Sequence, residues 1–218
     1  MRLQMSKFVS EFVKITGWPI QYACFRTKIY YEDKKAQSRK IKGPAIIVSN
    51  HMSVYDFAVM LYVFPNRYLR YLMAECLYRK KSLGRFLTVM GGVRVDRDTF
   101  DFSFVDKSLD ILEEGGVIGL FPESRLATEG EQRPLTFKPS AAYIAMLSGA
   151  PIIPVYTNGS YFKKRRARVI IGKPMHYDEL ARDVADEKKR LEAVSEILRQ
   201  KVIELGNELD RRTSKTKK

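Results

Sequence analysis

AIIVSNHMSVYDFAVMLYVF, residues 45–64, contains the pattern that decides the fold. Residues 45–48 are all apolar, which is typical of a strand buried on both faces of a parallel sheet. A polar stretch follows at residues 49–56, and residues 57–64 then form an apolar helical pattern that ends before Pro65. A strand that leads through a short loop into a helix is the unit from which α/β sheets are built.

Further segments of these two kinds alternate along the chain. Strand patterns occupy residues 27–33, 68–74, 93–95, 117–121, 152–156 and 168–171. Helical patterns lie between and after them, at residues 76–90, 104–114, 140–147 and 177–211. This alternation predicts an α/β fold with a mixed, mainly parallel sheet flanked by helices.

The first 31 residues differ, because they are amphipathic and rich in large apolar side chains. Lys7, Glu11 and Lys14 form a narrow polar stripe on a helix, with a wide apolar face around it. Gly17-Trp18-Pro19 is expected to break this helix, which predicts an N-terminal amphipathic helical pair. Such a pair either lies in a membrane interface or caps the core as a helical hairpin, and the pattern alone favours neither. No uninterrupted apolar stretch reaches membrane-spanning length.

The chain of 218 residues carries a formal net charge of +14. A charge of this size fits three kinds of partner, namely nucleic acid, an anionic membrane surface, or acidic substrates and carrier proteins. The charge alone does not choose among them. We divide the chain into an N-terminal segment at residues 1–31, one domain at residues 32–212 and a basic tail at residues 213–218.

Polar side chains follow three of the predicted strands. His51 and Asp56 follow the strand at residues 45–48, and Asp96 and Arg97 follow the strand at residues 93–95. Glu123, Ser124 and Arg125 follow the strand at residues 117–121. We expect them to share one crevice, because the carboxyl ends of parallel strands meet at the same edge of a sheet. An imidazole whose other nitrogen is held by a carboxylate can take the proton of a hydroxyl group, and arginine binds phosphate. The clusters therefore predict deprotonation of a hydroxyl on an anionic substrate.

Each cluster also has a purely structural explanation. Asp56 lies three residues after Ser53, which fits a helix cap with an acidic residue in the first turn. The clusters after the other two strands fit exposed ion pairs in turns. His176, in a late loop, is expected to be structural or exposed. Three polar clusters at three strand ends nevertheless favour a catalytic site over three unrelated turns.

Four motifs in this order resemble the glycerolipid acyltransferase family, which includes the 1-acylglycerol-3-phosphate acyltransferases. The family motif NHxSxxD stands as NHMSVYD at residues 50–56, and GGVRVDR at residues 91–97 is similar to the second motif. FPESRLA at residues 121–127 matches the third motif, FPEGTRS, in its first three positions. Phe137-Lys138 is similar to the family's FK stretch, and IIPV at residues 152–155 to its fourth motif.

This resemblance covers residues 45–160 and implies a reaction. The family transfers an acyl group from an acyl thioester, acyl-CoA or acyl carrier protein, to the free hydroxyl of a lysophospholipid. The implied acceptor is 1-acylglycerol-3-phosphate, and the product is phosphatidic acid. The resemblance implies that His51 is the catalytic base and that Asp56 orients it. The implied substrate-binding residues are Arg97, Glu123, Ser124, Arg125 and Lys138.

The resemblance also bears on the parts of the chain outside the motifs. It makes residues 32–212 an acyltransferase domain, in which Glu123 is expected to position an arginine or bind a glycerol hydroxyl. It favours the membrane-interfacial interpretation of residues 1–31. The protein would then lie peripherally on an anionic surface, the cytoplasmic face of the cell membrane.

We expect no metal and no cofactor besides the acyl-carrying co-substrate, because one well-placed histidine without a cysteine cluster offers no zinc ligand set. Three alternatives remain open. The acceptor could be another lysophospholipid or an aminolipid, or water could replace it in an acyl thioesterase. A basic nucleic-acid-binding module is the third, but only YFKKRR, residues 161–166, combines cations with aromatic rings as such a module requires. We therefore expect no nucleic-acid partner.

Overall fold

The computed structural model of the protein describes residues 2–96, 102–162 and 166–214. One seven-stranded sheet has the order β1-β7-β6-β2-β5-β3-β4. The strands are β1 (Lys28–Tyr31), β2 (Ala45–Ser49), β3 (Leu69–Ala74), β4 (Val93–Val95), β5 (Val117–Leu120), β6 (Ile152–Thr157) and β7 (Arg168–Ile171). The pairing of β6 with β7 is antiparallel and the other five pairings are parallel. The predicted α/β fold with a mixed, mainly parallel sheet is therefore confirmed.

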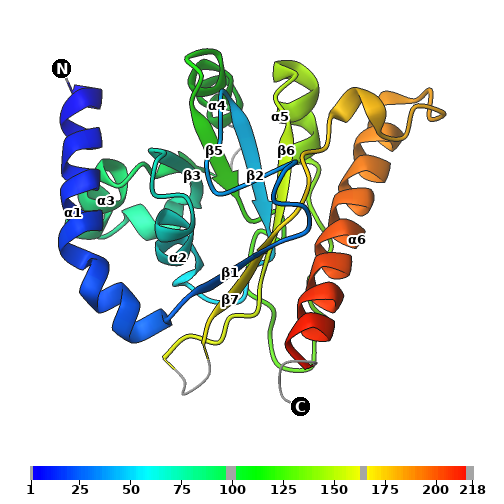
Figure 1. Cartoon of the computed structure of the whole chain (residues 1–218). Coiled ribbons are helices and arrows are strands. Elements are labelled where there is room, and N and C mark those ends of the chain that lie inside the picture. Colours follow the sequence, from blue (N-terminus) through cyan, green and yellow to red (C-terminus); the bar gives the residue numbers. More distant parts are fainter. Residues whose placement is uncertain (1, 97–101, 163–165, 215–218) are drawn as a thin grey trace.

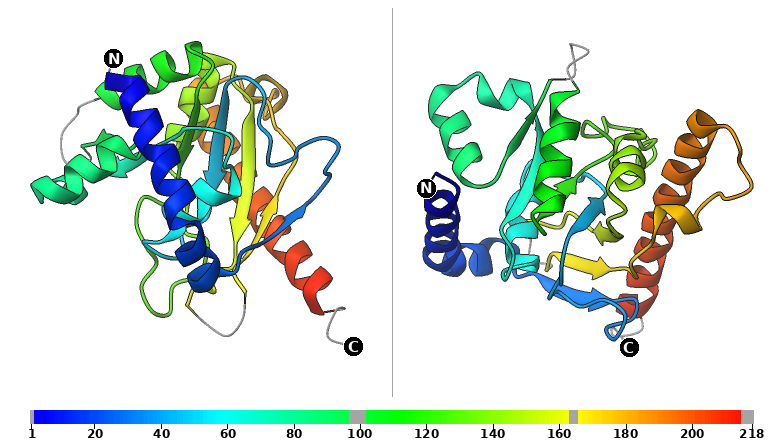
Figure 2. Two further views of the ribbon diagram at one scale, coloured as in Figure 1. Left: turned by 60° about the vertical axis from the view of Figure 1, so that its left-hand side comes forward. Right: turned by 90° about the horizontal axis from the view of Figure 1, so that it is seen from above.

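Helices cover both faces of the sheet (Figure 1). One face carries α1 (Arg2–Phe25), α2 (Asp56–Val63) and α3 (Lys81–Val89), and the other carries α4 (Ser103–Glu113), α5 (Ser140–Ser148) and α6 (Glu187–Ser214). Seen from above, α1 and α6 lie on opposite sides of the molecule (Figure 2). Short 3-10 turns lie at Glu75–Tyr78 and Tyr177–Glu179. The helices predicted at residues 76–90 and 177–211 therefore start later than expected, at Lys81 and Glu187.

Strand β2 lies at the centre of the sheet, and all five of its residues are buried. Ala45 and Ile47 pack into the core under α2, whereas Ile46 and Val48 pack into the core under α4 and α5. Complete burial of one such Ile or Val side chain contributes about 1.5–3 kcal/mol. The loop that follows β2 therefore starts from a strand that two apolar cores hold in place.

The N-terminal segment is one helix and not the expected helical pair. Helix α1 continues through Pro19 as far as Phe25, and its ribbon bends in this part (Figure 1). Proline lacks the N–H that would bond to the carbonyl of Ile15, and its ring pushes that carbonyl aside. A bend is enough to relieve this clash, so the chain stays helical. The predicted break at Gly17-Trp18-Pro19 is therefore wrong.

The two expected boundaries also move by a few residues. Strand β1 starts at Lys28 and pairs with β7, so the sheet already contains residues assigned above to the segment 1–31. Helix α6 includes Thr213, which is buried, and Ser214, so neither belongs to a tail. Residues 215–218 lie outside the described part of the chain. None of the described helices combines the length and the apolar character that crossing a bilayer requires.

Candidate active site

His51 lies in the loop between β2 and α2, at the carboxyl end of the central strand. Its Nδ1 is 2.9 Å from Oδ2 of Asp56. Because a carboxylate accepts hydrogen bonds, Nδ1 carries the proton and donates it, which leaves the lone pair on Nε2. Nε2 has no partner among the described residues, and 20% of the side-chain surface is exposed. The two residues predicted to act together therefore meet, and the imidazole is partly exposed.

The Asp56 side chain is completely buried and accepts four hydrogen bonds. Oδ2 accepts from His51 Nδ1 and from the backbone N–H groups of Met52 at 2.7 Å and Ser53 at 2.9 Å. Oδ1 accepts from the Tyr161 hydroxyl at 2.5 Å. A side chain that accepts in all four bonds is in the carboxylate form. Two of these bonds, from the N–H groups of Met52 and Ser53, hold the turn before α2. A structural role in that turn does not explain the bonds from His51 and Tyr161.

Two buried side chains hold the backbone around His51. Asn50 bonds to β6, since its Nδ2 donates to the Thr157 carbonyl and its Oδ1 accepts from the Thr157 N–H, both at 2.9 Å. Glu123 accepts from the His51 N–H at 2.6 Å and from the Leu135 N–H at 2.7 Å. Burial raises the pKa of Glu123 above its ordinary value of 4.5, although both N–H groups oppose the shift. Glu123 thus supports the loop, and no arginine of the described residues bonds to it.

Three rings form a continuous stack beside the pair. The His51 ring lies on Phe121, with 4.4 Å between centroids and an interplanar angle of 11°, and Phe121 lies on Tyr71 at 5.3 Å. The Tyr71 ring crosses β5 at Gly119, where an added Cβ would come within 2.4 Å of it. A glycine on β5 therefore makes room for the stack that fixes the plane of the imidazole.

The remaining predicted site residues are arranged less closely. The guanidinium of Arg125 is exposed and binds Glu131 through two bonds of 2.7 and 2.6 Å, and this contact holds the pKa of Glu131 well below its usual range. The Lys138 side chain is exposed and has no partner among the described residues, while its N–H donates to the Pro122 carbonyl. Ser124 has a φ of 63° in the turn that leaves β5. Arg97 lies outside the described residues.

Sequence reasoning missed Tyr161 and Thr157. Tyr161 lies 105 residues from Asp56 along the chain, and the Thr157 hydroxyl is 3.0 Å from the Tyr161 hydroxyl. No local pattern marks either residue, because both act through contacts between β6 and the loop after β2. Among the described residues no group of three or more His, Cys, Asp or Glu side chains is arranged to hold a metal ion.

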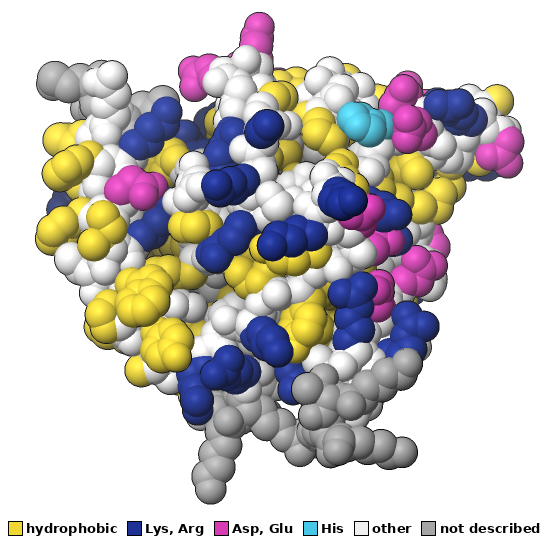
Figure 3. Space-filling view, viewed as in Figure 1, with side chains coloured by type: hydrophobic (Ala, Val, Ile, Leu, Met, Phe, Trp, Pro, Cys, Tyr) yellow, Lys and Arg dark blue, Asp and Glu magenta, His cyan; other side chains and the backbone are white. Residues whose placement is uncertain are grey.

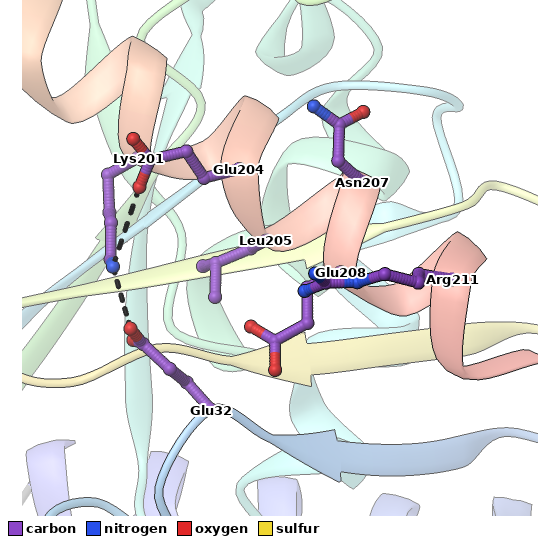
Figure 4. A pocket seen from close by; sticks show the side chains of 7 residues that line it. All are labelled: Glu32, Lys201, Glu204, Leu205, Asn207, Glu208 and Arg211. Carbon is purple, nitrogen blue, oxygen red and sulfur yellow. Dashed lines mark hydrogen bonds and ion pairs between the residues drawn. The ribbon is translucent and has the colours of Figure 1, made fainter.

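A separate groove of about 440 Å³ lies between α6 and the end of β1 (Figure 4). Lys201, in this groove, bonds to Glu32 at 2.7 Å and lies 3.7 Å from Glu204, so its charge is matched within the groove. Leu205, Asn207, Glu208 and Arg211 complete the lining. None of the predicted site residues lines it, and we assign no chemistry to it.

Comparison with known proteins adds to this geometry. A family model described as Acyltransferase matches residues 28–158, more than half of the chain. The chain belongs to the acyltransferase family. The match extends from β1 into the loop after β6 and includes His51, Asp56 and Glu123. The resemblance to glycerolipid acyltransferases is therefore confirmed, and the protein is an acyltransferase.

Three proteins similar to this acyltransferase all have names that describe acyl transfer to a 1-acylglycerophosphate. The 1-acyl-sn-glycerol-3-phosphate acyltransferase of Bacillus subtilis is 31% identical over 147 residues, which cover 65% of this chain and 71% of that protein. The human 1-acyl-sn-glycerol-3-phosphate acyltransferase beta is 28% identical over 159 residues, or 70% of this chain and 55% of that one. A crystal structure of the 1-acyl-sn-glycerophosphate acyltransferase of Thermotoga maritima superposes with a TM-score of 0.63, at 20% identity, over 94% of this chain and 83% of that chain. The last comparison establishes similarity of fold.

Proposed function

We propose that the protein transfers an acyl group from an acyl thioester to the free hydroxyl of 1-acylglycerol-3-phosphate, which yields phosphatidic acid. The observation that carries this proposal is the bond from His51 Nδ1 to the buried Asp56, in an imidazole that is partly exposed and whose Nε2 has no partner among the described residues. The names of the relatives support the acceptor, since both the bacterial and the human protein are called 1-acyl-sn-glycerol-3-phosphate acyltransferases.

In this reaction, Nε2 of His51 takes the proton of the acceptor hydroxyl as its oxygen attacks the thioester carbonyl. A C–O bond forms, the C–S bond breaks, and the imidazolium returns its proton to the leaving sulfur. Asp56 keeps the imidazole in the required tautomer and stabilises its cation. A positioned general base of this kind contributes about 10²–10⁴-fold to the rate.

Cations at the rim of the site bind the anionic parts of the substrates. Lys138 is the best placed of the predicted residues, because its ammonium is exposed and free of any described partner. Arg125 would have to break its ion pair with Glu131 before it could bind a substrate. Arg97 and Ser124 are also among the predicted substrate-binding residues. The donor is acyl-CoA or acyl carrier protein, with no other cofactor; both are anionic and suit the net charge of +14.

The orientation of α1 supports binding to a membrane surface. Three of its polar residues, Ser10, Lys14 and Gln21, are buried, and Lys14 donates to the carbonyls of Pro65 and Arg67 at 3.1 and 3.0 Å. Phe25 at its end is buried, but most of its large apolar residues are exposed: Met5, Phe8, Phe12, Ile15, Trp18, Ile20 and Tyr22. A helix that caps a core has the opposite arrangement, with its apolar face inward. The helical-hairpin alternative does not explain this polarity.

Apolar side chains gather over α1 at the left of the molecule, with lysines and arginines beside them (Figure 3). The exposed residues Val54 and Tyr55 lie between His51 and Asp56 in the chain, and the exposed ring of Phe162 packs edge-on against Tyr55 at 4.8 Å. An anionic bilayer fits this combination of apolar and cationic surface. Since the acyl donors are cytoplasmic molecules, the protein would lie peripherally on the cytoplasmic face of the cell membrane.

The test is an acceptor panel with radiolabelled acyl-CoA and acyl carrier protein as donors. We expect label in phosphatidic acid when 1-acylglycerol-3-phosphate is present, and little label in products of zwitterionic lysophospholipids or aminolipids. Transfer to one of those lipids alone would assign a different acceptor. Release of free fatty acid at the same rate with and without acceptor would identify a thioesterase and refute the proposal.

A further inference from the structure

The Tyr161 hydroxyl joins the candidate catalytic pair to the end of β6. It donates to Asp56 Oδ1 at 2.5 Å, and the Thr157 hydroxyl lies 3.0 Å from it. Because the proton of Tyr161 points at the carboxylate, Thr157 is the donor of the second bond. The structure thus contains a hydrogen-bonded chain from Thr157 through Tyr161 and Asp56 to His51. We infer that Tyr161 is a positioning residue for the acyl transfer proposed above, on which this inference rests.

The distribution of donors around Asp56 explains what Tyr161 does. Three donors, the imidazole and two backbone N–H groups, all meet Oδ2. Oδ1 has the Tyr161 hydroxyl as its described partner, and Asp56 is completely buried. Without that donor, Oδ1 would be a buried unpaired oxygen, and the carboxylate would gain by rotating toward the donors on its other side. Tyr161 therefore keeps Oδ2, and with it the His51 ring, in place.

Tyr161 is itself held firmly enough for this task. Its side chain is buried, and its ring meets that of Phe25, the last residue of α1, edge-on at 5.3 Å and 74°. The backbone of Thr157, at the end of β6, bonds twice to the Asn50 side chain, so this end of the chain of bonds is also tied to the loop before His51. Burial and the charge of Asp56 raise the pKa of Tyr161 further above its usual value of 10.0, so the hydroxyl remains a donor at neutral pH.

The first test compares Tyr161→Phe with Tyr156→Phe. Both remove one hydroxyl from the same segment, but the Tyr156 ring packs against Gly206 of α6, away from the pair. A hydrogen bond to a charged group contributes about 1.5–3 kcal/mol, so we expect Tyr161→Phe to lower kcat at least about tenfold. Both KM values should stay within about twofold, because the substrates do not touch Tyr161. Tyr156→Phe should leave kcat unchanged.

The second test reads the imidazole directly and requires no substrate. The chain has two histidines, so a His176→Gln background leaves the ring of His51 as the sole imidazole signal in a nitrogen-resolved NMR spectrum. We expect a bonded Nδ1 proton in this background, and its loss or broadening through solvent exchange when Tyr161→Phe is added. A structural role alone would lower the melting temperature without changing this signal.

The outcomes separate this inference from the proposed function. If Tyr161→Phe retains both kcat and the Nδ1 proton, Tyr161 does not position the pair, whatever the acceptor is. If the wild-type protein acylates no lipid of the panel, the proposed function is wrong, and the Nδ1 proton alone then decides whether Tyr161 orients His51. Loss of that proton in Tyr161→Phe but not in Tyr156→Phe supports the inference in either case.

Discussion

The loop from Asn50 to Asp56 and the helix α1 differ in how far the rest of the chain satisfies their side chains. In the loop, the buried side chains of Glu123 and Tyr161 and the backbone of Thr157 bond to the residues around the imidazole. In α1, three polar side chains, Ser10, Lys14 and Gln21, are buried against the protein, but the helix leaves a row of large apolar side chains exposed. The loop is complete as it stands, whereas the apolar face of α1 lacks a partner within the described chain.

This difference separates two tasks of an enzyme that acts on lipids. Hydrogen bonds between buried groups have strict geometry and determine where a proton can move. Apolar burial has no directional requirement, so a helix can bind a fluid surface without a fixed register. Substitutions in the loop should therefore change turnover, and substitutions on the apolar face of α1 should change the location of the protein.

The largest effect within this comparison is expected for Asp56→Asn. An amide has one acceptor and one donor group, so its NH₂ would face either Tyr161 or the donors at Oδ2, and the wrong imidazole tautomer would be favoured. We expect kcat to fall roughly 10³-fold, with binding to liposomes unchanged. Steady-state transfer assays and liposome sedimentation measure the two quantities. Normal turnover by a folded Asp56→Asn protein would contradict the role of the carboxylate.

The next effect concerns the other region. Replacing Phe8 and Phe12 on the exposed face of α1 by serine removes apolar area that would enter the bilayer. We expect binding to anionic liposomes to weaken by about 2 kcal/mol, roughly 30-fold. Turnover of a dispersed, short-chain acceptor should be unchanged. Point substitutions are preferable to a deletion of residues 1–31, which would remove β1 from the sheet.

The matched control replaces Leu147 and Ile197 by serine. Both are exposed apolar residues, and they lie on α5 and α6, on the other face of the sheet. Liposome binding by this variant should equal that of the wild-type protein. Equal loss in both double variants would mean that the membrane contact, if any, is not specific to α1.

A smaller effect is expected from the cations at the rim of the loop. Lys138→Ala should raise KM for 1-acylglycerol-3-phosphate about fivefold, since an exposed ion pair contributes up to about 1 kcal/mol. Arg125→Ala should raise it less than about twofold, because Glu131 already occupies that guanidinium. Initial rates at varied acceptor concentration give both values. A larger effect of Arg125→Ala would mean that the substrate displaces Glu131.

The smallest effect is a dependence of stability on pH that comes from Glu123. Its pKa is raised in the folded protein, so between pH 4.5 and the raised value the folded state binds more protons than the unfolded chain. The free energy of unfolding therefore falls as the pH rises through this window. Glu123→Gln cannot titrate and should lack this dependence, while losing about 1–2 kcal/mol overall because its NH₂ faces one of two backbone donors. Urea unfolding over a pH series would show whether the two curves converge as the pH rises.

The fold could be predicted largely from local pattern. Apolar runs such as residues 45–48 specify strands because burial on both faces leaves no polar position in them. The bend at Pro19 could not be predicted, since proline ends some helices and only bends others. Lys14 was recognised as part of a polar stripe and does bond to Glu11, but the stripe did not reveal its bonds to the carbonyls of Pro65 and Arg67, more than 50 residues away.

The residues of the site also divide into those that a local motif predicts and those that only the folded structure brings together. His51 and Asp56 are five residues apart, so a local motif was enough to pair them. The support for that pair comes from Tyr161, Thr157 and Glu123, whose contacts exist only once β2, β5 and β6 lie side by side. The charge of Arg125 suggested a substrate contact, but charge does not reveal that Glu131, six residues later in the same loop, already binds it.

The most direct test compares the two histidines of the chain. His51→Ala removes the base, whereas His176→Ala removes an exposed imidazole far along the chain, in the loop before α6. With radiolabelled acyl donor and 1-acylglycerol-3-phosphate, we expect transfer by folded His51→Ala protein to fall by roughly 10³-fold and transfer by His176→Ala to equal that of the wild type. Comparable turnover by both variants would contradict the assignment of His51 as the base.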